Sequence, residues 1–358
     1  MNDDLDNLRE KIDRLDEQIQ ALITERARIA EQVGKAKQGK GDNEFYRAER
    51  EAEVLRKVMA RNEGPLSDEE MARLFREIMS ACLALEQVMT IAFLGPEGTF
   101  TQAAALKHFG HSIATRPMAT IGDVFREVES EAASYGVVPI ENSTEGVINH
   151  TLDEFMTSSL KICGEVALRI HHHLLGQGEV PDGIRKIYSH QQSLAQCRNW
   201  LDTHMPDVAL LDVSSNAEAA RRAAAEPDAA AIAGEAAAEI YGLNILARNI
   251  EDDPDNTTRF LVIGRRETPA SGNDKTSLLI YTDNRPGALY AILEPLARNG
   301  ISMSRIESRP SRLGMWNYVF FIDIEGHVTD AAVITALQEL EQSASSVKVL
   351  GSYPCAVL

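Results

Sequence analysis

The strongest constraint on this chain is an apolar repeat near its start. Apolar side chains recur at alternating intervals of three and four residues, at Leu5, Leu8, Ile12, Leu15, Ile19, Leu22, Ile29 and Val33. This spacing aligns them on one face of an α-helix and is typical of a coiled-coil seam. The pattern predicts one long helix with an apolar face that needs covering, and the stretch Gly39-Lys40-Gly41-Asp42 ends it.

One position of this seam is charged. Arg26 stands where the repeat calls for an apolar residue. A buried charge persists only with a partner. The sequence leaves two partners open, a carboxylate on a neighbouring helix or a bound dianion.

Residues 1 to 90 are predicted to be entirely helical. A second helix, from about Glu44 to Arg61, would place Arg47, Glu51, Val54 and Val58 on one face. Gly64-Pro65 ends it, and Ser67-Asp68-Glu69-Glu70 has the form of a capping box that starts a third helix. The predicted inner face of that helix runs through Phe75, Met79, Cys82 and Glu86, so that a carboxylate lies on an apolar stripe.

At Ile91 the pattern changes to short apolar strands that alternate with alanine-rich helices, up to about residue 265. Polar clusters follow several of these strands, at Thr99-Phe100, Glu141-Asn142-Ser143, Ser189 to Gln196 and Ser214-Ser215-Asn216, and a further one, Asn256 to Arg259, precedes the apolar run at 260–263. Functional residues at the carboxyl ends of strands are the usual α/β arrangement, and helix starts there favour anions. One such cluster is more often a cap than a catalyst, but four in one module indicate a binding site.

The last part of the chain reads strand, helix, strand, strand, helix, strand from Thr276 to Ser352, which is a ferredoxin-like layout. A polar segment, Arg265 to Asp274, precedes it as a linker. Gly287, at the start of its first helix, would let a ligand approach the backbone, although a capped turn without a ligand is the simpler alternative.

Composition excludes several classes of function. The net charge is -18, and no cluster of Lys and Arg is long enough to follow phosphates, which argues against nucleic acid and anionic membranes. No uncharged run approaches about 18 residues, and the acidic start is unlike a signal peptide. Four scattered cysteines fit free thiols in the cytoplasm. His171-His172-His173 is not expected to bind a metal, because neighbours on a strand face opposite sides.

Three resemblances cover nearly the whole chain. Gly95 to Thr101, Val138 to Gly146 and Asn256 to Phe260 together resemble the prephenate dehydratases. The first 90 residues resemble the all-helical chorismate mutases, and Asn284 to Tyr290 with Glu307-Ser308-Arg309-Pro310 resembles the ACT regulatory domain. The chain as a whole is therefore similar to the bifunctional chorismate mutase/prephenate dehydratases.

This resemblance implies a multidomain fold. It comprises an all-α chorismate mutase-like module (residues 1–90), a dehydratase module of two α/β lobes, as in periplasmic binding proteins, with the site between them (91–266), a linker (267–274) and an α+β, ferredoxin-like ACT domain (275–358).

For the mutase, the resemblance implies rearrangement of chorismate to prephenate without a cofactor. The implied chorismate-binding residues are Arg9, Arg26, Lys37, Arg47, Arg50, Glu51, Cys82 and Glu86. Lys37 would donate to the ether oxygen, and Glu51 would accept from the substrate hydroxyl. Glu86 could donate to the same ether oxygen only when protonated, and the alternative is that it pairs with Arg47 or Arg50 and does not touch the substrate. The family often has Asp, Ser and Gln at the positions of Arg47, Cys82 and Glu86.

Helix geometry supports a dimer independently. Arg9 and Lys37 lie about 42 Å apart along a helix, at about 1.5 Å per residue, which no small substrate spans. If two long helices pair antiparallel, the partner's Arg9 approaches Arg26 and Lys37.

For the dehydratase, the resemblance implies conversion of prephenate to phenylpyruvate with loss of water and carbon dioxide. The implied prephenate-binding residues are Thr99, Phe100, Glu141, Asn142, Ser143, Ser189, Gln192, Gln196, Thr258 and Arg259. Thr258 is the candidate donor to the leaving hydroxyl, while Arg259 and the backbone near Thr99 would hold carboxylates. Glu141 could be the acid only if burial raised its pKa, so the proton donor stays open.

For the ACT domain, the resemblance implies allosteric inhibition by L-phenylalanine. The implied effector residues are Asn284, Gly287, Ala288, Leu289, Glu307, Ser308, Arg309 and Pro310. A homodimer or a dimer of dimers is expected. The alternatives are a cytoplasmic sensor of small anions or amino acids, and an enzyme with only one activity intact.

Overall fold

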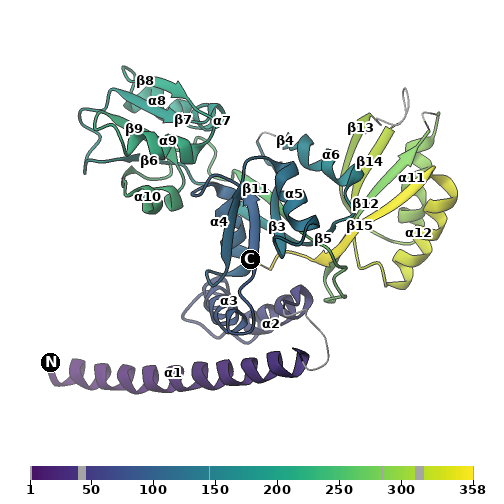
Figure 1. Cartoon of the computed structure of the whole chain (residues 1–358), viewed down its shortest axis with the longest axis horizontal. Helices are drawn as coiled ribbons and strands as arrows, with labels where there is room; N and C mark the ends of the chain where they lie inside the picture. The colour runs from purple at the N-terminus through teal and green to yellow at the C-terminus, as the bar shows by residue number, and fades with distance from the viewer. Residues whose placement is uncertain (1, 39–45, 145, 284, 311–317, 358) are drawn as a thin grey trace.

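The computed structural model describes residues 2–38, 46–144, 146–283, 285–310 and 318–357, apart from the side chains of residues 2, 3 and 38. It consists of a helical part, two α/β lobes and a C-terminal α+β domain, in chain order (Figure 1). Within these residues, no helix is both long and apolar enough to cross a membrane.

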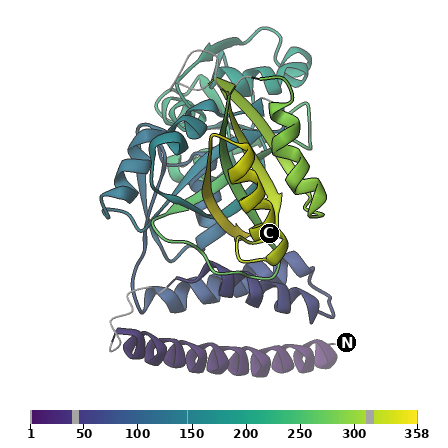
Figure 2. The same cartoon turned by 90° about the vertical axis from the view of Figure 1, so that its right-hand side faces the viewer.

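The predicted long helix is confirmed as α1 (Asn2–Gln38). It lies below the rest of the molecule, apart from the two lobes and the C-terminal domain, in both views (Figures 1 and 2). Its apolar side chains face solvent within this single chain, with Leu8 55% and Leu22 65% exposed. Near its end, the buried Gly34 of α1 lies against the side chain of Glu86, just beyond the end of α3. The seam is therefore a largely uncovered surface.

Helices α2 (Ala48–Ala60) and α3 (Asp68–Ala84) pack on each other between α1 and the first lobe. Ser67 caps α3 as predicted, because its side chain accepts from the backbone N–H of Glu70. The predicted inner face of α3 was only partly right. Its most buried stripe runs through Ala72, Arg76 and Ser80 and contacts the first lobe, where Ser80 accepts from the backbone of Ser112 at 3.2 Å.

The first lobe is built on a mixed sheet with the order β2-β1-β3-β11-β5 and a short β4 beside β3. Its strands are β1 (Thr90–Leu94), β2 (Ala114–Met118), β3 (Tyr135–Asn142), β4 (Gly146–Val147), β5 (Lys161–Arg169) and β11 (Thr257–Gly264). Its helices are α4 (Phe100–Phe109), α5 (Ile121–Glu129) and α6 (Asn149–Thr157). Strand β11 returns from the second lobe and pairs antiparallel with both β3 and β5.

The second lobe has its own sheet, in the order β10-β6-β9-β7-β8. Its strands are β6 (His173–Gly176), β7 (Lys186–Ser189), β8 (Ala209–Asp212), β9 (Ala229–Ala233) and β10 (Asn244–Ala247). Its helices are α7 (Gln191–Gln196), α8 (Arg198–His204), α9 (Asn216–Ala223) and α10 (Glu235–Tyr241). Buried alanines on β9 and α9 let this helix pack closely on the sheet. The prediction of two α/β lobes is confirmed.

The chain passes between the lobes twice, at residues 170–172 and 248–256. The two crossings are hydrogen bonded to each other, since Ile170 N–H donates to Asn256 O and Ile250 N–H donates to His172 O, each at 2.8 Å. Residues on these crossings therefore lie at the junction of the lobes.

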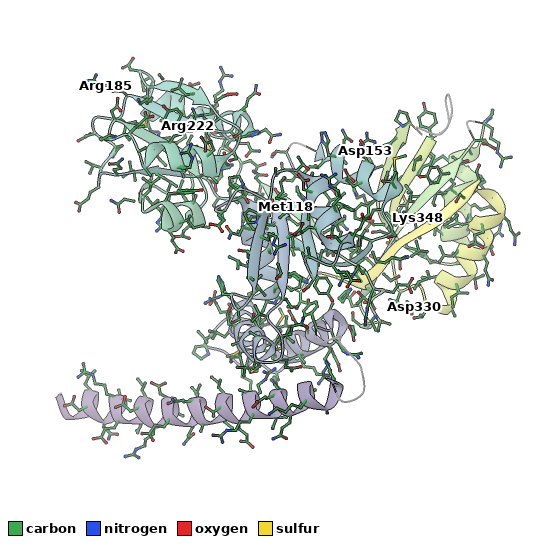
Figure 3. All side chains as sticks on the ribbon, in the orientation of Figure 1. Met118, Asp153, Arg185, Arg222, Asp330 and Lys348 are labelled. Atoms are coloured by element: carbon green, nitrogen blue, oxygen red, sulfur yellow. The ribbon has the colours of Figure 1, made fainter. Side chains whose placement is uncertain are left out.

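The C-terminal domain has the predicted ferredoxin-like order, β13-β14-β12-β15. Its elements are β12 (Asp274–Thr282), α11 (Ala288–Arg298), β13 (Met303–Pro310), β14 (Tyr318–Glu325), α12 (Ala331–Ser343) and β15 (Ser346–Pro354). Its sheet shares one apolar core with the first lobe. Gly351 marks the closest approach, because a Cβ there would stand 2.2 Å from the carbonyl oxygen of Ile162. At the same boundary, Lys348 donates to the carbonyl oxygens of Phe155 (3.0 Å) and Ser158 (2.7 Å) at the end of α6 (Figure 3).

Candidate active sites

Strands β3 and β11 divide the predicted dehydratase residues between two faces of the first sheet. Thr258 stands opposite Asn142 across the strands, and Arg259 stands opposite Glu141. Side chains of neighbouring residues on a strand point to opposite faces. The sequence motif therefore serves two separate sites.

On the first face, the Thr258 hydroxyl belongs to a directed hydrogen-bond network. Asn142 Nδ2 donates to Thr258 Oγ1 at 2.8 Å and to Asn256 Oδ1 at 2.9 Å. The backbone N–H of Thr144 donates to Asn142 Oδ1 at 3.0 Å, which fixes the orientation of that amide. Because Thr258 Oγ1 accepts from Asn142, its own hydrogen is left to donate to another group.

Gln196, from α7 of the second lobe, completes this network. Its Nε2 donates to Thr144 Oγ1 at 3.0 Å, and its Oε1 accepts from Asn256 Nδ2 at 3.1 Å and from His172 Nε2 at 2.8 Å. Sequence reasoning named Gln196 but missed Asn256, Thr144 and His172. The first two stood inside the motifs already identified. The signal for His172 was only its place in a run of three histidines, and it is 1% exposed.

The loop before α4 also meets the second lobe. Thr99 caps α4, accepting from Gln102 N–H at 3.4 Å and donating to Leu94 O at 3.1 Å. The ring of Phe100 lies edge-on to that of His172, with centroids 5.6 Å apart. Thr99 thus has the structural role of a cap, and Phe100 packs at the junction of the lobes.

Other predicted residues lie outside this network. Ser189 is fully buried in the second lobe, where its hydroxyl donates to Ile232 O at 2.9 Å. Gln192 is exposed on α7. Ser143 Oγ accepts from Thr257 N–H at 3.0 Å. Among the described residues, no group of three or more His, Cys, Asp or Glu side chains could hold a metal ion.

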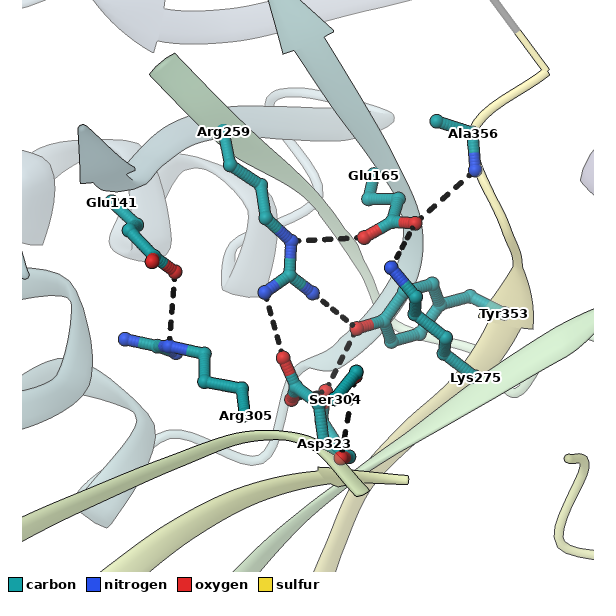
Figure 4. A network of polar contacts seen from close by, with 10 residues as sticks. Glu141, Glu165, Arg259, Lys275, Ser304, Arg305, Asp323, Tyr353 and Ala356 are labelled. Carbon is teal, nitrogen blue, oxygen red and sulfur yellow. Dashed lines mark hydrogen bonds and ion pairs between the residues drawn. The ribbon is translucent and has the colours of Figure 1, made fainter. Parts of the chain in front are cut away.

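The second face of β11 carries a buried ionic cluster at the C-terminal domain (Figure 4). Arg259 donates to Glu165 at 2.9 Å, to Asp323 at 2.7 Å and to the Tyr353 hydroxyl at 3.1 Å. Lys275 donates to the other oxygen of Glu165 at 2.8 Å. The side chain of Arg259 therefore points to the opposite face of β11 from the Thr258 hydroxyl, whereas the sequence-based expectation placed both in one substrate site.

Glu141 lies on this second face as well. It forms an ion pair with Arg305 of β13 at 3.1 Å (Figure 4). Together with Arg259 and Lys275 these side chains border a cavity of about 570 Å³ between the first lobe and the C-terminal domain. Glu141 is 40% exposed, so the burial that an acid role would require is not present.

In the helical part, Glu86 lies where α3 meets α1. A Cβ at Gly34 would stand 2.8 Å from Glu86 Cγ, so this glycine makes room for the glutamate. Burial raises the pKa of Glu86, and Lys37 acts to lower it. Glu86 Oε2 is buried with no hydrogen-bond partner among the described residues. Cys82, one turn earlier, is buried.

Three residues of the predicted chorismate set, all at or near α2, have partners elsewhere. Glu51 accepts from Arg76 at 3.2 Å at the boundary with the first lobe; burial raises the pKa of Glu51, and Arg76 lowers it. Arg50 pairs with Glu53 at 2.5 Å. Arg47 lies 3.8 Å from Glu49. In this structure these residues are not gathered around Lys37 and Glu86.

On α1, Arg9 is exposed and pairs with Asp6 at 3.3 Å, while Arg26 is half-buried. Within the described ranges, Arg26 has no carboxylate at ion-pair distance. Among the described residues of a single chain, the salt bridge that the sequence left open is thus not formed.

A third site lies in the C-terminal domain. A cavity of about 310 Å³ is lined by Gly287, Ala288, Leu289 and Ser308, all predicted effector residues. Glu307 and Pro310 are not among its lining residues, and Asn284 lies outside the described residues.

Arg309 belongs to a different surface. It points to the first lobe, where it pairs with Asp153 at 3.0 Å and donates to Asn149 O at 2.9 Å. Asp153 lies on α6 at this boundary (Figure 3).

Comparison with known proteins agrees with these three parts. Residues 8–87 match chorismate mutase type II, residues 91–268 match prephenate dehydratase, and residues 276–342 match the ACT domain. Fold and sites thus define a multidomain enzyme with a regulatory domain.

A bifunctional chorismate mutase/prephenate dehydratase from Stutzerimonas stutzeri is 58% identical over 361 residues, covering 99% of each chain. The chain belongs to the bifunctional chorismate mutase/prephenate dehydratase family. It has both activities, chorismate to prephenate and prephenate to phenylpyruvate.

Two solved structures cover the dehydratase and ACT parts. Prephenate dehydratase from Arthrobacter aurescens in complex with L-Phe is 37% identical, with a TM-score of 0.69, covering 74% of this chain and 89% of that one. A protein described as a quorum-quenching acylase is 32% identical, with a TM-score of 0.70, covering 75% of this chain and 98% of that one. One fold thus carries two described activities, so function has to be argued from the site.

Proposed function

We propose that Thr258 is the hydrogen-bond donor to the hydroxyl that leaves prephenate. Its place in the Asn142 network carries this proposal, because Oγ1 accepts at 2.8 Å and its hydrogen has no acceptor among the residues that the structure describes. In the reaction the bond to the ring carboxylate breaks, its electrons complete the aromatic ring, and the C–O bond to the hydroxyl breaks. The carboxyl carbon leaves as carbon dioxide. A positioned donor lowers the barrier to C–O cleavage, and the departing hydroxide takes up a proton, supplied in net terms by solvent, to become water.

The anionic groups of prephenate are assigned to other parts of the site. Arg259 is already held by Glu165 and Asp323, so we assign it to the domain boundary and not to a substrate carboxylate. The N-terminus of α4, beside Phe100, offers backbone N–H groups and the positive end of a helix dipole.

Thr258→Ala tests this role. Removing one well-placed donor costs about 10²–10³-fold in kcat at comparable sites, and we expect a loss of this size in dehydratase turnover. Thr258→Ser keeps the hydroxyl and is the matched control, expected to retain most activity. Mutase activity of the same chain should stay normal, because Lys37 and Glu86 lie in another domain. Equal loss of both activities would contradict separate sites.

For the mutase, we propose that Glu86 and Lys37 contact the substrate's ether oxygen, and that a second copy of the chain covers α1. The uncovered apolar face of α1 supports the dimer. The half-buried Arg26 would then share a dianion with the partner's Arg9, so each site draws cations from both chains.

For regulation, we propose that L-phenylalanine binds the cavity beside Gly287 and Ser308. The edge position of β13 in its sheet suits an interface between two such domains. The four free cysteines of the structure fit the expected cytoplasmic location.

A further inference from the structure

His172 lies on the first crossing between the lobes, between β5 and β6. Its backbone is fixed by the second crossing, since its N–H donates to Glu251 Oε2 and its carbonyl accepts from Ile250 N–H, each at 2.8 Å. The ring is held between Gln196 of the second lobe and Phe100 of the first. His172 is not one of the residues that contact substrate in the proposed mechanism.

The ring has one polar anchor among the described residues. Nε2 meets Gln196 Oε1 at 2.8 Å, whereas Nδ1 is buried without a partner. An amide oxygen can only accept, so the ring hydrogen belongs on Nε2. A hydrogen on Nδ1 would be buried with nothing to accept it. Burial also lowers the pKa of His172, which keeps the ring neutral.

This tautomer decides how Gln196 is oriented. With Oε1 toward His172, the same oxygen accepts from Asn256, and the NH₂ group is free to donate to Thr144. A flipped amide would place its NH₂ group against two other donors, His172 and Asn256, which costs about 1–3 kcal/mol for each group left unpaired. Gln196 therefore enters the Thr258 network in one orientation, which its two donors, His172 and Asn256, fix together.

We propose that His172 is a positioning residue for prephenate dehydration. It holds Gln196 of the second lobe in its hydrogen bonds to Thr144 and Asn256, beside the Asn142–Thr258 pair. The inference rests on the proposed role of Thr258. It does not make His172 an acid or base, because its one hydrogen is already donated to Gln196.

Three variants of the full chain separate the two ring nitrogens. His172→Gln can place an N–H near the position of Nε2, His172→Asn places its amide nearer Nδ1, and His172→Leu has neither. We expect dehydratase kcat to fall about tenfold in the Leu and Asn variants, corresponding to about 1.4 kcal/mol. KM should change less, since other groups hold the carboxylates. The Gln variant should stay within about threefold of the parent, an allowance of under 1 kcal/mol for imperfect geometry.

His173→Leu is the matched control. It removes a neighbouring buried imidazole whose Nδ1 accepts from Asn249 N–H at 3.1 Å. It should leave dehydratase kcat near that of the parent. If His172→Leu does not fold, the Gln and Asn variants alone decide the question.

A double-mutant cycle with Gln196→Leu tests the route. If His172 acts through Gln196, the double variant is no slower than Gln196→Leu alone. Three outcomes would each overturn the inference. The losses of kcat from His172→Leu and Gln196→Leu could be additive in the double variant, the Gln and Asn variants of His172 could be equally inactive, or His172→Leu could leave kcat unchanged. Thr258→Ala is measured alongside. Unimpaired turnover there refutes the role of Thr258, whereas a loss there with normal turnover in His172→Leu refutes only the present inference.

Discussion

The buried cluster around Arg259 yields a quantitative prediction about how the C-terminal domain is held. Arg259 and Lys275 supply two positive charges, and Glu165 and Asp323 supply two negative charges (Figure 4). Asp323 is 5% exposed, and its second oxygen accepts from Ser277 at 2.5 Å. Asp323→Asn keeps the shape and one acceptor oxygen but leaves the buried cluster with an unbalanced positive charge.

The expected cost follows from this imbalance. Removing one partner of a buried ion pair costs about 3–5 kcal/mol, and the low end applies because Glu165 still contacts Arg259. About 3 kcal/mol corresponds to a fall of about 12–24 °C in the melting temperature of a domain of this size. Differential scanning calorimetry on the full chain measures it, with the transition of the C-terminal part followed separately because several domains unfold.

Two further variants make the test specific to charge. Glu294→Gln breaks the exposed pair with Arg298 on α11 and should cost under about 1 kcal/mol. Arg259→Gln combined with Asp323→Asn restores charge balance and should be more stable than Asp323→Asn alone. If Asp323→Asn has the same melting temperature as the Glu294→Gln control, the electrostatic reasoning is wrong. It is also wrong if the double variant has the lowest melting temperature of all.

Three other predictions concern the remaining sites. Mutase activity should fall as pH rises through the raised pKa of Glu86, because only the protonated carboxyl can donate, and Glu86→Gln should flatten that limb; an unchanged pH–rate profile would remove Glu86 from the mechanism. Leu15→Glu on the exposed face of α1 should reduce both the molar mass measured by light scattering and mutase activity; an unchanged mass would contradict the dimer. Ala288→Phe should fill the effector cavity and abolish inhibition by L-phenylalanine, with the uninhibited rate preserved; inhibition at the same concentration would place the effector elsewhere.

Local patterns in the sequence predicted most of the elements. The apolar repeat gave α1, and the strand–helix alternation gave the lobes and the C-terminal domain. The predicted dehydratase site combined two residues whose side chains point to opposite faces of β11. Thr258 and Arg259 are neighbours on a strand, so they could not both face one ligand.

Other features depend on how domains dock, which no local pattern carries. Arg76 of α3 donates to the carbonyl oxygen of Lys107 in the first lobe at 2.7 Å. The same guanidinium donates to Glu51, which therefore lies at the boundary with that lobe. Asp323 meets Arg259 only because the C-terminal sheet packs on the first lobe. Such partners are distant in the sequence, and their pairing is decided by the assembled tertiary structure.

The adjacency of Thr258 and Arg259 also limits how an effector could act through this boundary. Inhibition requires that L-phenylalanine bind one of two arrangements of the C-terminal domain more tightly than the other. A tenfold preference supplies about 1.4 kcal/mol, which is less than the cost of about 3 kcal/mol assigned to an unbalanced cluster. The effector should therefore shift the cluster as a unit and not break it. Arg259 and Thr258 are joined by a single peptide bond on β11. A shift of the cluster that contains Arg259 would therefore also move Thr258, the proposed hydrogen-bond donor.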